Sequence, residues 1–447
     1  MSVTDYLMVL PVPHFRAGRD RVAVESSFAE HLLMVRRQLG DAGNRLVVAS
    51  PSMRIETYES RKQGLSIVDE DNTSIRFCTL YSEDAIRSPL STLRQIFPVL
   101  RTVYARSKES FCIHSGFSWT ALLPFEFASI LIGKALGRRT VFVVDIDYRN
   151  SASMSYKIGA YSLKSYILCR LIYDNVRSLQ LQFAARYCSL VMLKGRKLVA
   201  DYGAGRPNVK YILDASHSAS NIIDAEQLER KVRETRDRSQ PIRLTYFGRL
   251  TAYKGIDRCL QATVAAKQSG ANVQLDIIGS GEQLDALRRL TSELQADAYV
   301  RFHSALPFDR DFFTFLYQYH LLLAAPLRED TPRSALDAMA AGIPYLAFDT
   351  YYYKELLESG AGRTVPWPDV DAMARALVTL EQNREELASM VEHSVEYARA
   401  NTQEIWLKRR FDWTFSNDST DGRASQSIPY LMNRDHGSSS DHGFVER

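Results

Sequence analysis

The second half of the chain alternates short apolar runs with segments of helical periodicity. The apolar runs predict strands at 242–247, 273–278, 300–302, 320–325 and 343–348. The spacing of apolar residues between and after them predicts helices at about 257–268, 282–295, 333–341, 352–358 and 369–381. Strands that are apolar throughout are typical of parallel sheets, which are covered on both faces. This half therefore predicts an α/β domain built on a doubly wound parallel sheet.

The first half shows the same alternation in a less regular form. Strands are predicted at 5–12, 45–49, 111–114, 140–144, 190–193 and 209–213, with helices at about 23–39 and 118–136. A polar, charged stretch separates the two series. We expect an N-terminal domain at 1–215, a linker at 216–240, a C-terminal domain at 241–383, helices crossing back to the N-terminal domain at 384–415 and a disordered tail at 416–447.

The composition is that of a globular protein. Of 447 residues, 45% are hydrophobic and 24% are charged, which excludes a chain that is disordered throughout. The formal charge of +4 is too small to indicate nucleic-acid binding. Five scattered cysteines without a C-x-x-C spacing fit neither a disulfide framework nor a zinc site, and they favour a reducing compartment.

Targeting signals do not stand out in the sequence. The apolar run near the N-terminus is broken by Pro11 and follows no basic region, unlike a signal peptide. No window reaches the ~18 apolar residues that a membrane span requires. We expect a cytoplasmic protein that is at most attached to a membrane face.

The densest chemical signal is the segment 329–344, directly after the strand at 320–325. Thr331 is a suitable N-cap, and Pro332 suits the first helical position. The unpaired amides of Arg333 and Ser334 would then point out of the carboxyl edge of the sheet. Such amides bind phosphate, helped by the helix dipole. The segment therefore predicts an anion site.

Two carboxylates flank this anion site. Glu329 precedes the helix, while Asp337 lies one turn inside it, on the same face as Arg333. Carboxylates beside a phosphate are expected to bind hydroxyls, such as those of a ribose or another sugar. The alternative interpretation is an ordinary capped helix whose acids are solvated.

Two further loops follow neighbouring strands. Gly248, Arg249 and Lys254 come after the strand at 242–247, at the edge where open α/β sheets bind ligands. Two cations there would stabilise a diphosphate as a leaving group. Gly279 and Gly281 follow the strand at 273–278. Each motif is weak alone, but together the three indicate one nucleotide-binding edge.

These segments resemble glycosyltransferase family 4. The resemblance rests on GRLTAYKG, LDIIGSGEQLDALRRL, VRFHSAL and REDTPRSALDAMAAGIPYLAFDT; it is strong over roughly 242–381 and mainly topological over 1–215. It implies the GT-B fold, in which two Rossmann-like domains face each other across a cleft. It also implies a retaining transfer from a nucleoside diphosphate sugar, with no metal and no other cofactor.

The resemblance also assigns roles to residues. Arg249 and Lys254 would contact the diphosphate, Glu329 the transferred sugar and Asp337 the ribose hydroxyls. The family often carries a histidine after the fourth or fifth N-terminal strand, close to the reacting sugar. This chain offers His114 after one such strand and Asp145 after the next.

Three features depart from the family pattern. Asp337 is one methylene shorter than the usual glutamate, and Asp330 stands where glycine is common. Three tyrosines at 351–353 replace glycines and would crowd the donor pocket.

Asp145 and Asp147 form a D-x-D, the metal-binding signature of the other large glycosyltransferase fold. That fold has a single nucleotide-binding domain, which does not suit two strand–helix series. Metal binding by the pair is kept as an alternative. Either acid could instead accept a proton from the acceptor.

Positive charge is concentrated at 151–215. This stretch holds ten Lys and Arg against three Asp, and four tyrosines between 156 and 173 alternate with basic and aliphatic residues. The pattern suits an anionic membrane surface or a lipid-diphosphate acceptor, whereas a solvated helix face is the alternative. No accompanying motif indicates nucleic acid.

We therefore predict a GT-B glycosyltransferase that moves a sugar to a saccharide or lipid-linked acceptor bound by the N-terminal domain. A polyprenyl-diphosphate-linked oligosaccharide in surface-polysaccharide synthesis is the favoured acceptor. Two alternatives are kept: a sugar-nucleotide epimerase with the same donor site, and a non-catalytic partner subunit.

Overall fold

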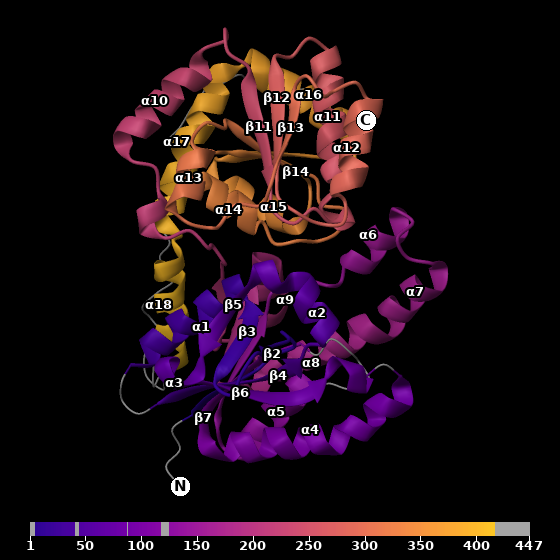
Figure 1. The fold of residues 1–447 in the computed structure, drawn as a ribbon, viewed down its shortest axis with the longest axis vertical. Helices are drawn as coiled ribbons and strands as arrows, with labels where there is room; N and C mark the ends of the chain where they lie inside the picture. Colours follow the sequence, from indigo (N-terminus) through magenta and orange to yellow (C-terminus); the bar gives the residue numbers. More distant parts are fainter. Residues whose placement is uncertain (1–4, 41–43, 87, 118–124, 416–447) are drawn as a thin grey trace, which may run out of the picture. The chain divides into compact units, whose positions relative to one another are not determined.

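The computed structural model describes residues 5–40, 44–86, 88–117 and 125–415 (Figure 1). The tail predicted at 416–447 and the first part of the helix predicted at 118–136 lie outside the described residues. Two parallel sheets organise the rest of the chain, and each belongs to one half of the sequence.

Seven strands of the described residues form the first sheet, in the order β10-β9-β8-β7-β1-β4-β6, and every neighbouring pair is parallel. Their bounds are β1 (Asp5–Val9), β4 (Arg45–Ser52), β6 (Ile75–Ser82), β7 (Ser110–Gly116), β8 (Arg139–Val144), β9 (Leu190–Lys194) and β10 (Val209–Ile212). Every residue of β1 and β9 is buried, as expected of strands covered on both faces.

The helices of this half connect the strands and pack on the sheet. They are α1 (Ser26–Leu39), α2 (Ile55–Arg61), α3 (Glu70–Thr73), α4 (Pro89–Glu109), α5 (Phe125–Ala135), α6 (Ser151–Lys157), α7 (Leu163–Leu168), α8 (Asp174–Tyr187) and α9 (Arg196–Gly203). A π-helical turn at Cys169–Tyr173 joins α7 to α8. The excursion from α6 to α8 thus lies between β8 and β9.

A small antiparallel sheet near the N-terminus corrects the sequence prediction. β2 (Phe15–Arg16) and β3 (Arg21–Glu25) pair with β5 (Leu65–Asp69) in the order β2-β3-β5. The predicted helix at 23–39 therefore begins only at Ser26, because the buried β-branched residues before it form β3. The predicted strand at 5–12 ends at Val9, ahead of Pro11. The sequence pattern predicted neither β6 nor α4.

Among the described residues, six strands form the second sheet, in the order β13-β12-β11-β14-β15-β16, again with parallel neighbours. Their bounds are β11 (Ile242–Phe247), β12 (Val273–Ile278), β13 (Val300–His303), β14 (Leu321–Ala324), β15 (Tyr345–Phe348) and β16 (Gly362–Val365). The five strands predicted in this half agree with the first five of these within two residues. β16 was not predicted.

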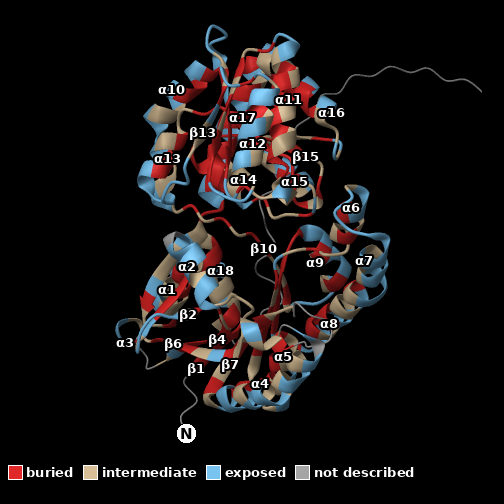
Figure 2. Ribbon diagram, turned by 45° about the vertical axis from the view of Figure 1, so that its right-hand side comes forward, coloured by how far each residue is buried: buried red, intermediate tan, exposed pale blue. Residues whose placement is uncertain are grey.

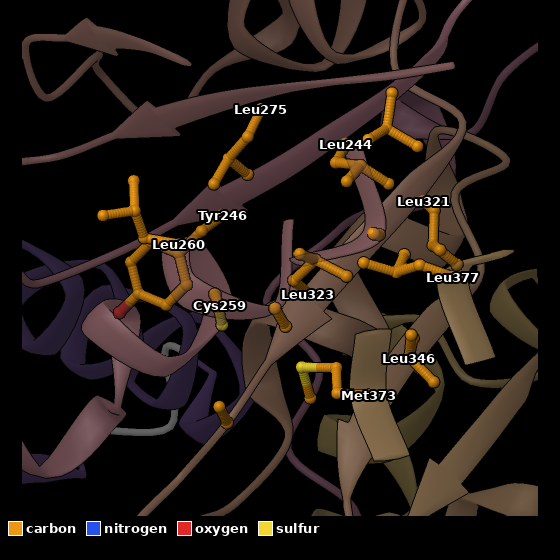
Figure 3. Close-up of a cluster of buried hydrophobic side chains, with 14 of the residues drawn as sticks. Leu244, Tyr246, Cys259, Leu260, Leu275, Leu321, Leu323, Leu346, Met373 and Leu377 are labelled. Atoms are coloured by element: carbon orange, nitrogen blue, oxygen red, sulfur yellow. The ribbon is translucent and has the colours of Figure 1, made fainter. Parts of the chain in front are cut away.

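The second half also contains most of the remaining helices. They are α10 (Ala225–Arg236), α11 (Ile256–Gln268), α12 (Leu284–Glu293), α13 (Arg310–Leu316), α14 (Arg333–Ala340), α15 (Tyr351–Leu356), α16 (Val370–Gln382), α17 (Arg384–Ala400) and α18 (Gln403–Phe415). Figure 3 shows part of the core between the sheet and its helices, where Leu244, Leu275 and Leu323 of three neighbouring strands cluster with Met373 and Leu377 of α16.

Helix α10 occupies much of the stretch predicted as a linker. Leu228 and Val232 of α10 pack against Ala388 and Val391 of α17. The high charge of the segment concealed this helix in the sequence. Its apolar face makes it part of the packing of the second half.

Helix α18 contacts the first sheet. The rings of Trp406 in α18 and Tyr211 in β10 lie 5.9 Å apart in an edge-to-face arrangement. The guanidinium of Arg410 donates a hydrogen bond to the carbonyl of Leu213 at 2.5 Å.

No helix among the described residues combines the length and the apolar character needed to cross a bilayer.

In each sheet the strand order reverses at one point. β1 lies between β7 and β4, and β11 lies between β12 and β14. Ligands of open α/β sheets bind outside the carboxyl ends of the strands at such a point. The loops that follow β11 and β14 are therefore placed where a ligand is expected.

Protonation of His320 should weaken the fold at acid pH. His320 is buried before β14, and its Nδ1 accepts a hydrogen bond from the Arg243 amide at 3.0 Å. Burial, together with the cations Lys231, Arg384 and Arg243, lowers the pKa of His320 to about 3. The unfolded chain binds this proton below its ordinary pKa of about 6.5 and the folded chain does not. The free energy of unfolding should therefore fall as pH drops from about 6.5 toward 3, by up to ~1.4 kcal/mol per pH unit from this group.

His320→Asn keeps an acceptor for the amide but does not titrate. Urea unfolding at a series of pH values should show a shallower pH dependence for this variant than for the wild type. Parallel curves for the two proteins would contradict the assignment.

Candidate active site

The two motifs singled out in the sequence meet at the reversal point of the second sheet. β11 pairs with β14, and the Leu327 amide donates to the Tyr253 carbonyl at 2.8 Å. The loop after β11 and the loop after β14 therefore lie side by side, with α14 starting directly behind them.

The glycines after β11 and β12 bring a third loop against the first. The Gly248 amide donates to the Ile278 carbonyl, and the Leu250 amide donates to the Ser280 carbonyl. A Cβ at Gly279 would collide with the backbone oxygen of Gly248, and one at Gly281 with that of Leu250. Close backbone approach thus explains both glycines. Their contact with a ligand stays a prediction.

The two predicted phosphate-binding cations differ in their surroundings. The Arg249 side chain is exposed, and no ion pair of this residue occurs within the described part of the chain. The Lys254 ammonium, in contrast, forms an ion pair with Asp330. The acid that replaces a common glycine of the family therefore neutralises one of the two cations.

The N-terminus of α14 differs from the sequence expectation. The helix begins at Arg333 with Pro332 in the N-cap position, and its first turn has no side-chain cap, so Thr331 is not the capping residue. The Arg333 amide donates to the Thr331 carbonyl at 2.8 Å and is not available to an anion. The Ser334 amide has no hydrogen bond within the described residues. One of the two predicted donors is therefore available.

Glu329 is buried and is held by donors from both halves of the chain. Its Oε1 accepts from the Asn150 side-chain amide at 3.0 Å, and its Oε2 accepts from the Tyr351 amide at 3.2 Å. Burial raises the pKa of Glu329, the two hydrogen bonds oppose this, and the charges of Asp147 and Asp349 add to it. Asn150 was missed in the sequence, although it lies in the loop after β8 that holds the D-x-D.

Asp337 is buried against the segment that follows β10. Its Oδ1 accepts from the amides of Ser216 and His217 at 2.8 and 2.9 Å, and it lies 3.3 Å from the His217 Nδ1. The shorter acid therefore has a clear structural role in fixing the passage between the sheets. Ribose binding by Asp337 stays a prediction.

His114 lies within β7, and its Nδ1 is 2.8 Å from the Tyr6 hydroxyl. Burial lowers the pKa of His114 to about 3, with His31 and Arg410 acting in the same direction. The imidazole is therefore neutral at physiological pH.

Asp145 is exposed at the end of β8 and lies 3.4 Å from the Lys194 ammonium.

A charged cluster near these residues was not predicted. Asp214 forms ion pairs with Lys194 at 3.0 Å, with Arg410 at 3.5 Å and with Arg333. Burial alone would raise the pKa of Asp214, but the three cations hold it well below its ordinary range. His31 of α1 faces this cluster, and burial together with Arg410 lowers its pKa to about 4. The guanidinium of Arg333, the residue whose backbone amide was predicted to bind phosphate, thus binds a carboxylate of the first half.

Tyr352 joins the start of α15 to the ends of β8 and β9. Its hydroxyl accepts from the Asp147 amide at 2.8 Å and donates to the Lys194 carbonyl at 3.2 Å. Three residues later, Glu355 accepts from the Lys197 amide in the first turn of α9 at 3.1 Å. Tyr352, one of the three tyrosines that replace family glycines, therefore joins the two halves.

The D-x-D does not present two free carboxylates. Arg149 donates to both oxygens of Asp147, at 2.9 Å from its Nε and at 2.6 Å from its Nη2. Among the described residues, no group of three or more His, Cys, Asp and Glu side chains is arranged to hold a metal ion.

Comparison with known families concerns the second half of the chain. Residues 228–397 match the profile of the family described as "Glycosyl transferases group 1". This range contains the whole second sheet and both carboxylate motifs. The glycosyltransferase domain expected from the sequence is thereby confirmed.

Curated relatives share parts of this glycosyltransferase domain. The UDP-N-acetylglucosamine–peptide N-acetylglucosaminyltransferase GtfA subunit of Streptococcus gordonii is 32% identical over 113 residues, which are 25% of this chain and 22% of that protein. The amylovoran biosynthesis glycosyltransferase AmsK of Erwinia amylovora is 26% identical over 176 residues, 38% of this chain and 42% of that protein. The chain thus spans less than half the length of these relatives.

Solved structures resemble nearly the whole chain in fold. HepE of Anabaena, solved with UDP, has a TM-score of 0.61 at 14% identity, covering 92% of this chain and 99% of that one. WaaG, described as a glycosyltransferase involved in lipopolysaccharide biosynthesis, has a TM-score of 0.60 at 13% identity, covering 92% and 100%. The predicted GT-B fold is confirmed, while the narrower assignment to family 4 stays a prediction.

Removal of the Tyr352 hydroxyl should destabilise the protein. Tyr352→Phe leaves the buried Asp147 amide without its acceptor, which costs about 1–3 kcal/mol. Tyr351→Phe is the matched control, because no hydrogen bond of the Tyr351 hydroxyl occurs among the described residues, and it should stay within about 0.5 kcal/mol of the wild type. Denaturant unfolding measures both variants. Equal effects would contradict the role assigned to Tyr352.

Proposed function

We propose that this protein transfers a sugar from a nucleoside diphosphate sugar to an acceptor. One observation carries the proposal: the loop with Arg249 and Lys254 and the segment from Glu329 to Asp337 are far apart in the sequence, yet they adjoin at the reversal point of a group 1 glycosyltransferase domain. Cations beside carboxylates at a sheet edge match a ligand that combines phosphates with sugar hydroxyls.

The diphosphate would lie on Arg249, Lys254 and the start of α14. HepE, with the same fold, was solved with UDP and with UDP-glucose, which supports a nucleotide sugar as the donor. Lys254 would exchange Asp330 for phosphate oxygens, and Arg333 would likewise exchange Asp214. Cations on the departing diphosphate stabilise the charge that develops as the sugar leaves.

The sugar would contact Glu329, and the ribose would contact Asp337. Retention of the anomeric configuration is proposed on the family resemblance. Both carboxylate oxygens of Asp147 accept hydrogen bonds from Arg149. Because these oxygens already have a cationic partner, they support a transfer without a metal ion. Activity should accordingly survive treatment with EDTA. His114 and Asp145 are proposed to face the acceptor side of the reaction.

The proposed acceptor is a lipid-linked oligosaccharide in surface-polysaccharide synthesis, used at the inner face of a cell membrane. The names of two similar proteins support this: AmsK is an amylovoran biosynthesis glycosyltransferase, and WaaG is involved in lipopolysaccharide biosynthesis. Closure of the halves around the donor would exclude water and limit hydrolysis.

Arg249→Ala should weaken donor binding. Charge-assisted hydrogen bonds to phosphate contribute about 1.5–3 kcal/mol, so affinity should fall by about ten- to one-hundred-fold. Thermal shift with UDP, GDP, ADP and dTDP identifies the nucleotide, and titration calorimetry then gives the affinity. The control is Arg289→Ala, since Arg289 is exposed on α12 after another strand. Unchanged affinity in Arg249→Ala would show that the diphosphate site is misplaced.

Glu329 and Asn150 should act together in turnover. Glu329→Gln should lower kcat more than it changes donor KM. The reason is that the contact between Glu329 and the transferred sugar is expected to stabilise mainly the transition state. Loss of the Asn150 hydrogen bond removes a group that favours the ionised carboxylate. Asn150→Ala should therefore raise the pKa of Glu329 further. The charges of Asp147 and Asp349, which also raise this pKa, are unchanged in the variant.

If turnover needs the ionised carboxylate, the acid limb of the kcat profile should move to higher pH in Asn150→Ala. An unshifted limb would contradict this coupling.

Formation of isomerised sugar nucleotide without an acceptor would instead indicate an epimerase. Donor binding without turnover or hydrolysis would indicate a partner subunit.

A further inference from the structure

Exposed apolar side chains are concentrated on the excursion between β8 and β9. Nine of the nineteen large apolar or aromatic side chains that are exposed in the described residues fall between 156 and 187. Within 163–172 no side chain is buried, and only Tyr166 and Cys169 are half-buried. Figure 2 shows α7 largely in the exposed colour, whereas the strands of the first sheet are largely in the buried colour.

One face of α7 is covered and the opposite face is not. Tyr166 stacks on Tyr156 of α6, with ring centroids 4.9 Å apart. The uncovered face carries five aliphatic side chains that are 45–68% exposed along α7 and the π-helical turn, a single residue followed by two adjacent pairs at steps of four and three residues: Leu163, Ile167, Leu168, Leu171 and Ile172. We call these five residues the apolar face. Leu179, 63% exposed, lies on α8 farther along the run.

Basic residues lie close to the apolar face in the sequence. Between 151 and 187 there are five Lys and Arg and a single acid, Asp174. Asp174 is already bound to Arg170 at 3.4 Å. Lys157 and Lys164 are exposed close to the apolar face. An apolar helix face with positive charge at its margin is complementary to a surface that is apolar below and anionic above.

We propose that the apolar face docks on an anionic membrane surface. The helical run from α7 to α8 would lie in the plane of the lipid headgroups, with its leucines and isoleucines among the acyl chains. Lys157 and Lys164 would contact the phosphate groups. The run is not a membrane span, in keeping with the absence of a span-forming helix among the described residues.

The same excursion is joined to the candidate active site. The Arg170 guanidinium donates to the Arg149 carbonyl at 3.1 Å. Arg149 precedes Asn150, which binds Glu329. A membrane-bound apolar face would thus hold the loop after β8 near the bilayer surface. Docking is a property of the surface and does not depend on the proposed donor chemistry.

The test is co-sedimentation of the full chain with vesicles, without any nucleotide sugar. Vesicles of phosphatidylcholine alone are compared with vesicles that also contain phosphatidylglycerol. We expect binding to the anionic vesicles, little binding to the neutral ones, and weaker binding as salt is added.

Two double variants separate the apolar and the charged parts. Ile167→Gln with Leu171→Gln should reduce partitioning at least about tenfold, because two aliphatic side chains no longer leave water. Lys157→Gln with Lys164→Gln should reduce it roughly thirtyfold, which corresponds to the ~2 kcal/mol expected for two basic residues near an anionic surface. Glutamine is a good helix former, so the helices are retained.

The matched control is Leu306→Gln with Phe308→Gln, which removes two exposed apolar side chains from the loop after β13. It should bind anionic vesicles like the wild type, and circular dichroism should show all variants folded. Equal binding by all variants would overturn the proposal. Failure to bind, with a dimer in sedimentation velocity that Ile167→Gln and Leu171→Gln dissociate, would overturn it in favour of a self-association surface.

Discussion

The pairing of β11 with β14 is the constraint on which the rest of the site depends. Parallel strands present their carboxyl ends at one edge, so two loops about 75 residues apart in the chain become neighbours once these strands pair. The cationic loop after β11 and the carboxylate segment after β14 have no chemical relation in the linear sequence. Their adjacency brings two weak motifs to one edge of the sheet, where we propose that the donor binds.

Electrostatic pairing within the chain is the second organising feature. Lys254 binds Asp330, and Arg333 binds Asp214, so two cations assigned to the diphosphate are neutralised by carboxylates. Charges removed from water need such partners, because the cost of desolvation is otherwise not offset. A donor diphosphate would therefore enter by exchanging one anion for another. Arg249 is exposed and needs no such exchange.

The departures from the family pattern have partners in the structure. The hydroxyl of Tyr352, where the family has glycine, is satisfied by the Asp147 amide and the Lys194 carbonyl of the first half. The carboxylate of the shorter acid, Asp337, accepts hydrogen bonds from backbone amides of the segment after β10. The new partners of Tyr352 and Asp337 lie in the first half or in the segment that follows it, whereas Asp330 pairs with Lys254 of its own half.

The sequence by itself determined the first five strands of the second sheet, and helices α11, α12, α14, α15 and α16, to within two residues, because apolar runs and helical spacing are local properties. It did not predict β16, α10 or α13. It also located the loops with Arg249, Lys254 and Glu329, since ligand-binding residues follow strands in this fold class. The prediction of Thr331 as a helix cap was wrong. Strand β3 was missed, because its last residues were assigned to the helix predicted directly after it.

Only the tertiary structure decided which side chains meet. Asn150 with Glu329, Tyr352 with Asp147, and Asp214 with Arg333 join residues that are 119 to 205 positions apart. The charge of the stretch 151–215 suggested a membrane surface, but the sequence did not show that one face of α7 is uncovered, because its leucines match those of any core helix. A helical pattern records that one face is apolar, but whether a neighbour covers that face depends on how distant segments pack.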